Sequence, residues 1–320
     1  MSDGLDGSDG QNDQKTGNLA SVEADGADPV VVKIGGARAV DPAGAIGDIA
    51  HLSEHDRDIV VVHGGSSAVD ETLDRLGKSP EYVETPDGVV GRFTDAETMD
   101  VFEMVLPGRV NTDLTAELQD AGVDAVGLSG VDGGLLSGPR KPAVRVQDGA
   151  KQKIKRGDHS GKIEAVADGL LWTLLDAGYA PVISPPMLGE ESDGTTIPVN
   201  ADADRAAAAV AGALGAELIL LTDVEGVYAD PEKSETIIGS VTQSEEMEVL
   251  ETAAEGFMTR KVMAAREALT IGAPAVTVST ANRSDPVIDA LDGAGTRIHR
   301  EAVAGEDAPS DTDSPRGGNR

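Results

Sequence analysis

Short runs of β-branched and other apolar residues recur through the middle of the chain. Segments in which Ala, Leu and Glu follow helical spacing lie between them. Apolar runs of this length, separated by helical patterns, are typical of a mainly parallel sheet covered by helices, so the pattern predicts an α/β fold. The expected strands are residues 29–36, 58–65, 124–130, 180–186, 216–224 and 273–280.

A second pattern interrupts this alternation. Residues 140–163 alternate polar and apolar positions around Asp148 and Gly149, which predicts a β-hairpin inserted outside the main parallel sheet. Residues 1–28 and 302–320 are polar and have almost nothing to bury, so both are expected to be disordered tails.

The net charge is the compositional feature that adds most to this interpretation. The chain of 320 residues carries a formal net charge of −31 and no cysteine. Self-repulsion of this size destabilises a compact state in dilute buffer and is screened in concentrated salt, so we interpret the charge as halophilic adaptation. The alternative, an acidic disordered protein, conflicts with the apolar runs, and a nucleic acid is an unfavourable partner. With no signal-like or membrane-spanning segment in the sequence, we expect a cytoplasmic protein.

Three of the expected strands end in turns of small residues, at 33–36 (KIGG), 63–66 (HGGS) and 127–130 (GLSG). Glycine there lets backbone N–H groups approach an anion, although a glycine after a strand is more often only a tight turn. Neither GxxxxGK[ST] nor a GxGxxG after a strand is present. Lys33 precedes its glycine pair and can point toward an anion that Gly35 and Gly36 cradle.

These motifs, in their order and spacing, resemble the amino acid kinases, and within them the acetylglutamate kinase branch. The resemblance covers nearly all of residues 29–300. It implies an open αβα sandwich with an acceptor-binding N-terminal lobe at 29–190 and an ATP-binding C-terminal lobe at 191–301. The segments that carry it are VVVKIGG, VVHGG, GRFTDAET, VGLSGVDGGLL, NADADRAA, LILLTDVEGVY and GFMTRKVMAA.

The resemblance implies catalytic roles for Lys33 and Lys261, which would flank the transferred phosphoryl group, and for Asp204, which would orient both lysines. Charge spread over phosphoryl oxygens is what such a pair stabilises. Without the resemblance, Lys261 would be interpreted as a solvated helix residue. Asp204 and Asp202 compete in register, and counting back from residues 218–221 favours Asp204; either could also cap a helix.

For the acceptor, the resemblance implies contacts from Gly64, Gly65, Arg92 and Asn200, with Arg92 gripping an α-carboxylate. An ion pair of Arg92 with Asp95 or Glu97 is the structural alternative. The residues implied to bind ATP are Lys33, Gly35, Gly36, Thr222, Asp223, Tyr228 and Lys261. Mg²⁺ is expected on the nucleotide phosphates, with no metal-binding cluster in the protein. Ser66 and the GFMTRK segment depart from the family pattern, which has a third glycine and GGMxPK there.

The acceptor is predicted from charge and resemblance together. Residues 140–162 hold eight basic and two acidic residues, a net of about +6 in a chain of −31. A basic patch in so acidic a protein suggests an acidic partner. The chain also resembles the branch that phosphorylates glutamate or α-aminoadipate attached to an acidic amino-group carrier protein (LysW) in arginine and lysine biosynthesis. Carrier docking is assigned to Lys151, Lys153, Lys155 and Arg156.

Three alternatives stay open from the sequence. The hairpin lysines could simply cover apolar surface with their stems. The enzyme could be a free N-acetylglutamate kinase with the same residues and chemistry. It could also be a catalytically silent nucleotide sensor, which the joint presence of Lys33, Asp204 and Lys261 disfavours. The resemblance further implies a homodimer built through the acceptor lobe.

Overall fold

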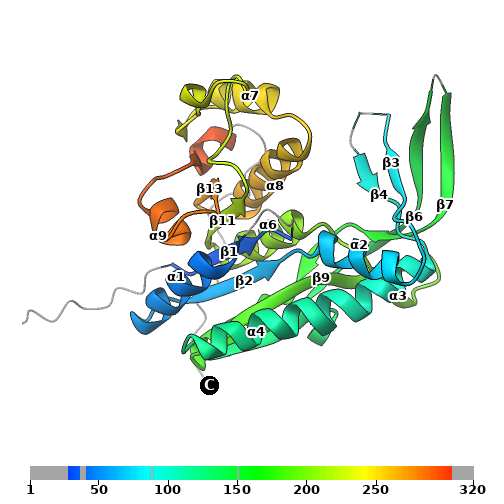
Figure 1. Ribbon diagram of the computed structural model, residues 1–320, viewed down its shortest axis with the longest axis horizontal. Helices are drawn as coiled ribbons and strands as arrows, with labels where there is room; N and C mark the ends of the chain where they lie inside the picture. Colours follow the sequence, from blue (N-terminus) through cyan, green and yellow to red (C-terminus); the bar gives the residue numbers. More distant parts are fainter. Residues whose placement is uncertain (1–27, 37–40, 87, 89, 150, 305–320) are drawn as a thin grey trace, which may run out of the picture.

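The computed structural model describes residues 28–36, 41–86, 88, 90–149 and 151–304 (Figure 1). Residues 1–27 and 305–320, which make up most of the two predicted tails, lie outside the described residues. At the C-terminal end the folded part reaches further than the sequence predicted. Ala302 and Val303, which fall in the tail predicted to start at 302, lie in the short helix η4 (Arg300–Val303) and are buried.

All six expected strands form, and they pair with one another in parallel. Their order across the sheet is β13-β11-β1-β2-β9, and β5 also pairs with β9. Strands buried on both faces need apolar residues at nearly every position, which explains the continuous runs. Their bounds are β1 Val30–Ile34, β2 Ile59–His63, β5 Ala125–Gly130, β9 Ala180–Glu190, β11 Glu217–Thr222 and β13 Ala275–Thr280.

Shorter strands extend this core into a mixed sheet. β14 (Thr296–His299) runs antiparallel to β13, and β12 (Ser240–Val241) pairs with β14 at that edge. β10 (Thr196–Val199) folds back antiparallel on β9. The α/β class and the mainly parallel sheet are therefore confirmed.

Helices cover both faces of the sheet (Figure 1). One face packs against α1 (Ala43–Glu54), α4 (Asn111–Asp120) and α9 (Pro286–Leu291). The other packs against α5 (Asp168–Asp176), α6 (Ala203–Leu214) and α8 (Phe257–Ile271), with α7 (Ser244–Ala253) beside α8. Because side chains alternate along a strand, Val30 and Val32 of β1 enter the first core and Val31 enters the second.

Next to β2 and β9, a smaller helical layer is built from α2, α3 and a π-helical segment. α2 (Ser66–Arg75), α3 (Ala96–Glu103) and the π-helix η1 (Met104–Val110) share a separate apolar cluster. η1 contains Pro107 and continues directly into α4. Two single turns complete the helices, η2 (Asp132–Gly134) and η3 (Ser234–Thr236).

Two hairpins project from one end of the sheet (Figure 1). β3 (Tyr82–Glu84) and β4 (Val90–Arg92) form a separate two-stranded sheet. The predicted basic hairpin is β6 (Leu136–Asp148) with β7 (Lys151–Gly161). The residues predicted as a hairpin pair with each other from Arg140–Gly161 to Asp148–Lys151. The residues of β6 that precede them belong to the main sheet: Leu136 and Ser137 pair with β8 (Ala165–Val166), and 137–139 pair with β9.

Candidate active site

A buried cluster of three charged side chains lies between β1, α6 and α8. The Lys33 ammonium is 2.7 Å from Oδ1 of Asp204, and the Lys261 ammonium is 3.0 Å from Oδ2 of the same carboxylate. The three side chains are 7–11% exposed. Lys33 reaches this cluster because it alternates with Val32 on β1 and shares the sheet face of Val31, which α6 and α8 cover.

The cluster carries one more positive than negative charge. Burial raises the pKa of Asp204, but the two ammonium groups outweigh burial and hold the pKa of this carboxyl well below its usual range. Burial, followed by repulsion from Lys33, lowers the pKa of Lys261. Each lysine repels the other and both are attracted to Asp204, so an anion placed between the ammonium groups relieves that repulsion.

The two competing aspartates have different tasks. Asp202 is the N-cap of α6, and its Oδ1 accepts hydrogen bonds from the backbone N–H of Asp204 at 3.0 Å and of Arg205 at 3.1 Å. That cap fixes the first turn of α6 and turns Asp204 inward to the lysines. The geometry therefore agrees with the choice of Asp204 over Asp202 for contact with the lysine pair.

The first two glycine turns meet in backbone contact. A Cβ on Gly36 would lie under 3.0 Å from the backbone of Gly64 and Gly65, and one on Gly64 would lie 3.8 Å from Cβ of Ala203 at the start of α6. Both turns thus lie beside the helix that carries Asp204. The third turn is different, because Gly127 faces the Asn111 side chain and Gly130 faces Pro186 and Leu136. There the structural explanation, close packing, is sufficient.

His63 and Asn111 stabilise the Gly64–Gly65 turn through hydrogen bonds. The amide of Asn111 donates to Nε2 of His63 at 3.0 Å and to the Val182 carbonyl at 2.8 Å. With Nε2 accepting, Nδ1 of His63 carries the proton and donates to the Gly64 carbonyl at 3.0 Å. Burial lowers the pKa of His63 to about 4, so the ring is neutral near pH 7. The sequence analysis missed this pair, although a histidine at a buried strand end was visible in the VVHGG run.

Arg92 lies on β4 and is buried against polar and aromatic partners. Its guanidinium pairs with Asp70 and donates to the Tyr82 hydroxyl at 2.9 Å. It also lies 3.5 Å from the Ser66 carbonyl at the start of α2. Asp95 instead caps α3, and Glu97 pairs with Lys78, so the alternative surface pair is not formed.

Asn200 is held where the base of the β6–β7 hairpin meets α6. Its side chain donates to Oγ1 of Thr94 at 3.3 Å, and its backbone N–H donates to the His159 carbonyl at 2.7 Å. The buried carboxylate of Asp158 accepts the Thr94 N–H at 3.0 Å. Asn200 and the segment that follows Arg92 are thus tied to the same end of β7.

The predicted nucleotide contacts lie at the same sheet edge as Lys33. Lys33 pairs with Leu220 in register, and Thr222 follows two residues later at the end of β11, with its hydroxyl 3.1 Å from Oδ1 of Asp223. Tyr228 forms a bridge with Ile237, and Gly35 directly follows β1. In the part of the chain that the structure describes, no hydrogen bond or ion pair links Tyr228 to the charged cluster.

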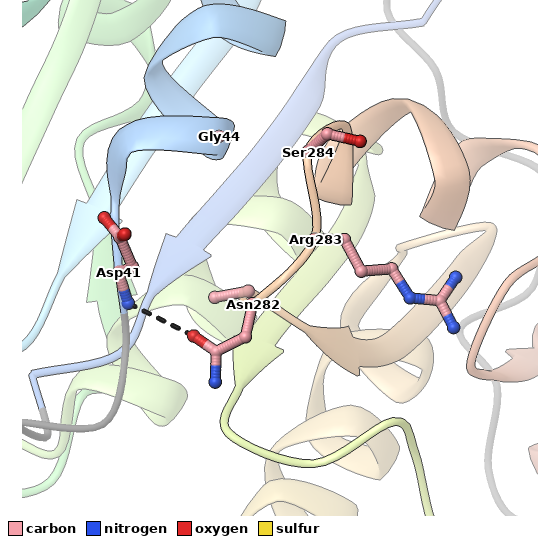
Figure 2. A pocket seen from close by; sticks show the side chains of 6 residues that line it. Asp41, Gly44, Asn282, Arg283 and Ser284 are labelled. Carbon is pink, nitrogen blue, oxygen red and sulfur yellow. Dashed lines mark hydrogen bonds between the residues drawn. The ribbon is translucent and has the colours of Figure 1, made fainter.

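A cavity of about 300 Å³ lies elsewhere, between the start of α1 and the segment after β13. Figure 2 shows the Asp41 backbone N–H donating to the Asn282 side chain at 3.3 Å. The cavity is lined by Asp41, Gly44, Ala281, Asn282, Arg283 and Ser284, none of which was predicted as a site residue. It lies on the α1 and α9 side of the sheet, whereas the charged cluster lies on the α6 and α8 side.

The four residues assigned to carrier docking do not share one face. In the β6–β7 ladder, Lys151, Lys153 and Lys155 oppose Asp148, Val146 and Val144, whereas Arg156 opposes Ala143 on the other face. Lys155 is already engaged: it pairs with Glu81, and its ammonium lies 4.0 Å from the Phe93 ring centre. The face of the hairpin that carries Lys151, Lys153 and Lys155, which we call the lysine face, is therefore turned toward β3.

Comparison with known proteins identifies the family. The family model described as "Amino acid kinase family" matches residues 28–279. The chain belongs to the amino acid kinase family. It is 39% identical over 270 residues to a [LysW]-aminoadipate kinase of Deinococcus radiodurans, with 84% of this chain and 91% of that protein covered.

A further relative and a solved structure define how far the likeness in sequence and in fold reaches. An acetylglutamate kinase of Methanopyrus kandleri is 42% identical over 245 residues, covering 76% of this chain and 91% of that one. The fold also matches a carbamate kinase of Giardia lamblia bound to AMP-PNP, with a TM-score of 0.60, 16% identity, and 86% and 99% of the two chains covered.

This amino acid kinase is accordingly a carboxyl-group phosphotransferase of an ATP-using family. Within the described ranges, no helix is long and apolar enough to cross a membrane. The described residues also contain no group of three or more His, Asp or Glu side chains placed to hold a metal ion.

Proposed function

We propose that this kinase transfers the γ-phosphoryl group of ATP to the side-chain carboxylate of glutamate or α-aminoadipate linked to a small acidic carrier protein of the LysW type. The product is an acyl phosphate for arginine or lysine biosynthesis. The observation that carries the chemistry is the Lys33–Asp204–Lys261 cluster. The carrier is supported by relatives named as LysW-linked kinases and by the basic hairpin.

In the proposed reaction an acceptor carboxylate oxygen attacks the γ-phosphorus, the bond from that phosphorus to the β,γ-bridging oxygen breaks, and ADP leaves with the bonding electron pair. No proton transfer is needed, because the attacking carboxylate is already ionised. The ammonium groups of Lys33 and Lys261 stabilise charge on the phosphoryl oxygens and on the departing bridging oxygen. Asp204 holds both ammonium groups at one point, because each of its two carboxylate oxygens contacts one lysine.

The remaining predicted residues are proposed to hold the two substrates. Gly64, Gly65, Arg92 and Asn200 would bind the acceptor, with the guanidinium of Arg92 on its α-carboxylate. Gly35, Gly36, Thr222, Asp223 and Tyr228 would bind ATP together with the two lysines. Magnesium would enter on the nucleotide phosphates and neutralise part of their charge.

The carrier is proposed to dock on the lysine face of the β6–β7 hairpin. Lys151 and Lys153 share a face with Lys155, which leans toward β3 and the Arg92 side of the acceptor site. Arg156 belongs to the opposite face, so the docking surface we propose is smaller than the four residues predicted from the sequence.

Paired charge reversals test this arrangement. The Lys151→Glu/Lys153→Glu variant should raise KM for carrier-linked substrate at least about tenfold and leave KM for ATP unchanged, because the reversed charges repel an acidic carrier and neither residue is proposed to bind ATP. Arg145→Glu/Arg156→Glu reverses two charges on the opposite face and is the matched control. A short acceptor without the carrier body should be phosphorylated equally by all three proteins. Normal KM for carrier-linked substrate in the lysine variant would remove the hairpin from docking.

A second candidate is free N-acetylglutamate kinase activity, which the 42% identity to the Methanopyrus kandleri enzyme favours. This activity would use the same Lys33–Asp204–Lys261 cluster and the same acceptor residues as the carrier-linked reaction. It differs only in that no carrier docks on the basic hairpin. A homodimer through the acceptor lobe and a cytoplasmic location remain parts of the proposal.

A further inference from the structure

Arg260 directly precedes Lys261 on α8 and contacts two other parts of the site. Its Nη2 donates to the Val90 carbonyl on β4, and its Nη1 lies 3.6 Å from the Asp202 carboxylate at the N-cap of α6. β4 carries Arg92, and α6 carries Asp204. One guanidinium therefore joins the strand of the acceptor arginine, the helix of the bridging aspartate and the helix of the second lysine.

The guanidinium lies close to the backbone of β4. A Cβ at Gly91 would lie 3.0 Å from Nη2 of Arg260, a tight contact that a small shift of the arginine side chain would relieve. Arg260 is about 29% exposed and Asp202 about 33%, so both are screened only in part. The fork of donors lets arginine hold a carbonyl and a carboxylate at once, which a lysine ammonium on one flexible stem does less well.

β3 and β4 need such a tether, because they pair with each other and not with the main sheet. On the acceptor side, Arg92 and Tyr82 fasten them to Asp70 of α2. Arg260 fastens them to the side of the molecule that carries Lys261. Phosphoryl transfer depends on the distance between the bound acceptor and the lysine pair, and errors near 1 Å cost about 100-fold in rate.

We propose that Arg260 is a positioning residue that fixes the β3–β4 hairpin, and with it Arg92, at the distance from Lys261 and α6 that phosphoryl transfer requires. It acts through Val90 and Asp202 and does not itself touch the reacting atoms. The inference rests on the acceptor-binding role proposed for Arg92. It applies to any acceptor whose α-carboxylate Arg92 holds, so it does not depend on the carrier.

The test compares Arg260→Ala, Arg260→Lys and a matched control, Arg266→Ala, with wild type. Arg266 lies on the same helix and pairs with Glu251 at 2.5 Å, away from β4. Kinetics are measured with whichever acceptor the wild type phosphorylates. Arg260→Ala should raise KM for the acceptor about tenfold or more and lower kcat, with KM for ATP within about twofold, because the contacts to Val90 and Asp202 that hold β4 against α6 are lost while the residues proposed to bind ATP are unchanged. Arg260→Lys should recover part of the loss, and Arg266→Ala should behave as wild type.

Amide hydrogen exchange without substrates gives a readout that is independent of the acceptor. Arg260→Ala should speed exchange in residues 82–92 and leave the β1 and β11 amides unchanged, whereas Arg266→Ala should do neither. Equal loss of affinity for ATP and acceptor, or unchanged exchange in 82–92, would overturn the positioning role. If carrier-linked substrates prove inactive with wild type but these exchange differences appear, the proposed carrier is wrong and the role of Arg260 stands.

Discussion

Asp204 holds two ammonium groups within 3.0 Å in a site that is about nine-tenths buried, and this contact defines the chemistry at the scale of single residues. Each lysine acts on charge that develops during transfer. Lys33→Ala and Lys261→Ala should therefore each lower kcat by about two to four orders of magnitude with modest changes in KM. Steady-state kinetics at saturating substrates and high salt check this. Near-normal kcat in either variant would remove that lysine from its role.

His63 gives the second prediction for a single side chain. Its pKa is lowered from 6.5 to about 4 in the folded protein, so the unfolded chain binds the proton more readily. The free energy of unfolding therefore includes the full contribution of the neutral, buried His63 ring above pH 6.5. That contribution is lost as the pH falls from 6.5 toward 4, by about 1.4 kcal/mol per pH unit. Denaturant unfolding across this window should show a shallower pH slope for His63→Gln than for wild type. Identical slopes would show that His63 is not buried as a neutral ring.

Lys33, Asp204 and Lys261 were singled out through the resemblance to the amino acid kinases, whose motifs keep their order and offsets along the chain, and the structure brings the three side chains together. Sequence spacing could not find Asp70 and Tyr82, which hold Arg92. Those partners come from other elements, and their contacts exist only after the chain folds.

At the scale of elements, we expect substitutions in the glycine turns after β1 and β2 to lower the stability of the protein. Gly36→Ala would place a methyl group under 3.0 Å from the backbone of Gly64 and Gly65, so the two turns must separate. We expect a loss of about 1–3 kcal/mol in unfolding free energy, together with most of the activity. Gly47→Ala on α1, where no atom lies within 4 Å of the added Cβ, is the control and should gain about 0.5–1 kcal/mol. Chemical denaturation measures both, and equal stabilities would contradict the close packing of the turns.

The β6–β7 hairpin shows which properties of an element could be predicted from the sequence and which could not. Alternation around Asp148–Gly149 correctly predicted β6 and β7. It did not show that β6 begins inside the main sheet, since residues 136–139 carry no signal for which strand they join. Nor could composition alone show that Lys155 is bound to Glu81 while Arg156 lies on the opposite face.

For the whole molecule, the parallel core was predictable because strands buried on both faces are apolar throughout. The net charge of −31 is a separate property of the entire surface. If it is an adaptation to salt, the melting temperature should rise by about 10 °C or more between millimolar and molar KCl, as repulsion among the acidic residues is screened. Thermal unfolding at several KCl concentrations tests this. A melting temperature independent of salt would mean that the charge has another origin.

The most direct test of the proposed function is a comparison of acceptors with the purified wild-type kinase in molar KCl. ATP-dependent acyl phosphate formation is measured with glutamate and α-aminoadipate linked to a LysW-type carrier, and with free N-acetylglutamate, and kcat/KM is obtained for each. We predict that a carrier-linked acceptor gives the higher kcat/KM by at least about tenfold, because the carrier adds binding energy that the free amino acid lacks. A higher kcat/KM for free N-acetylglutamate would contradict the carrier-linked assignment and favour the acetylglutamate kinase alternative.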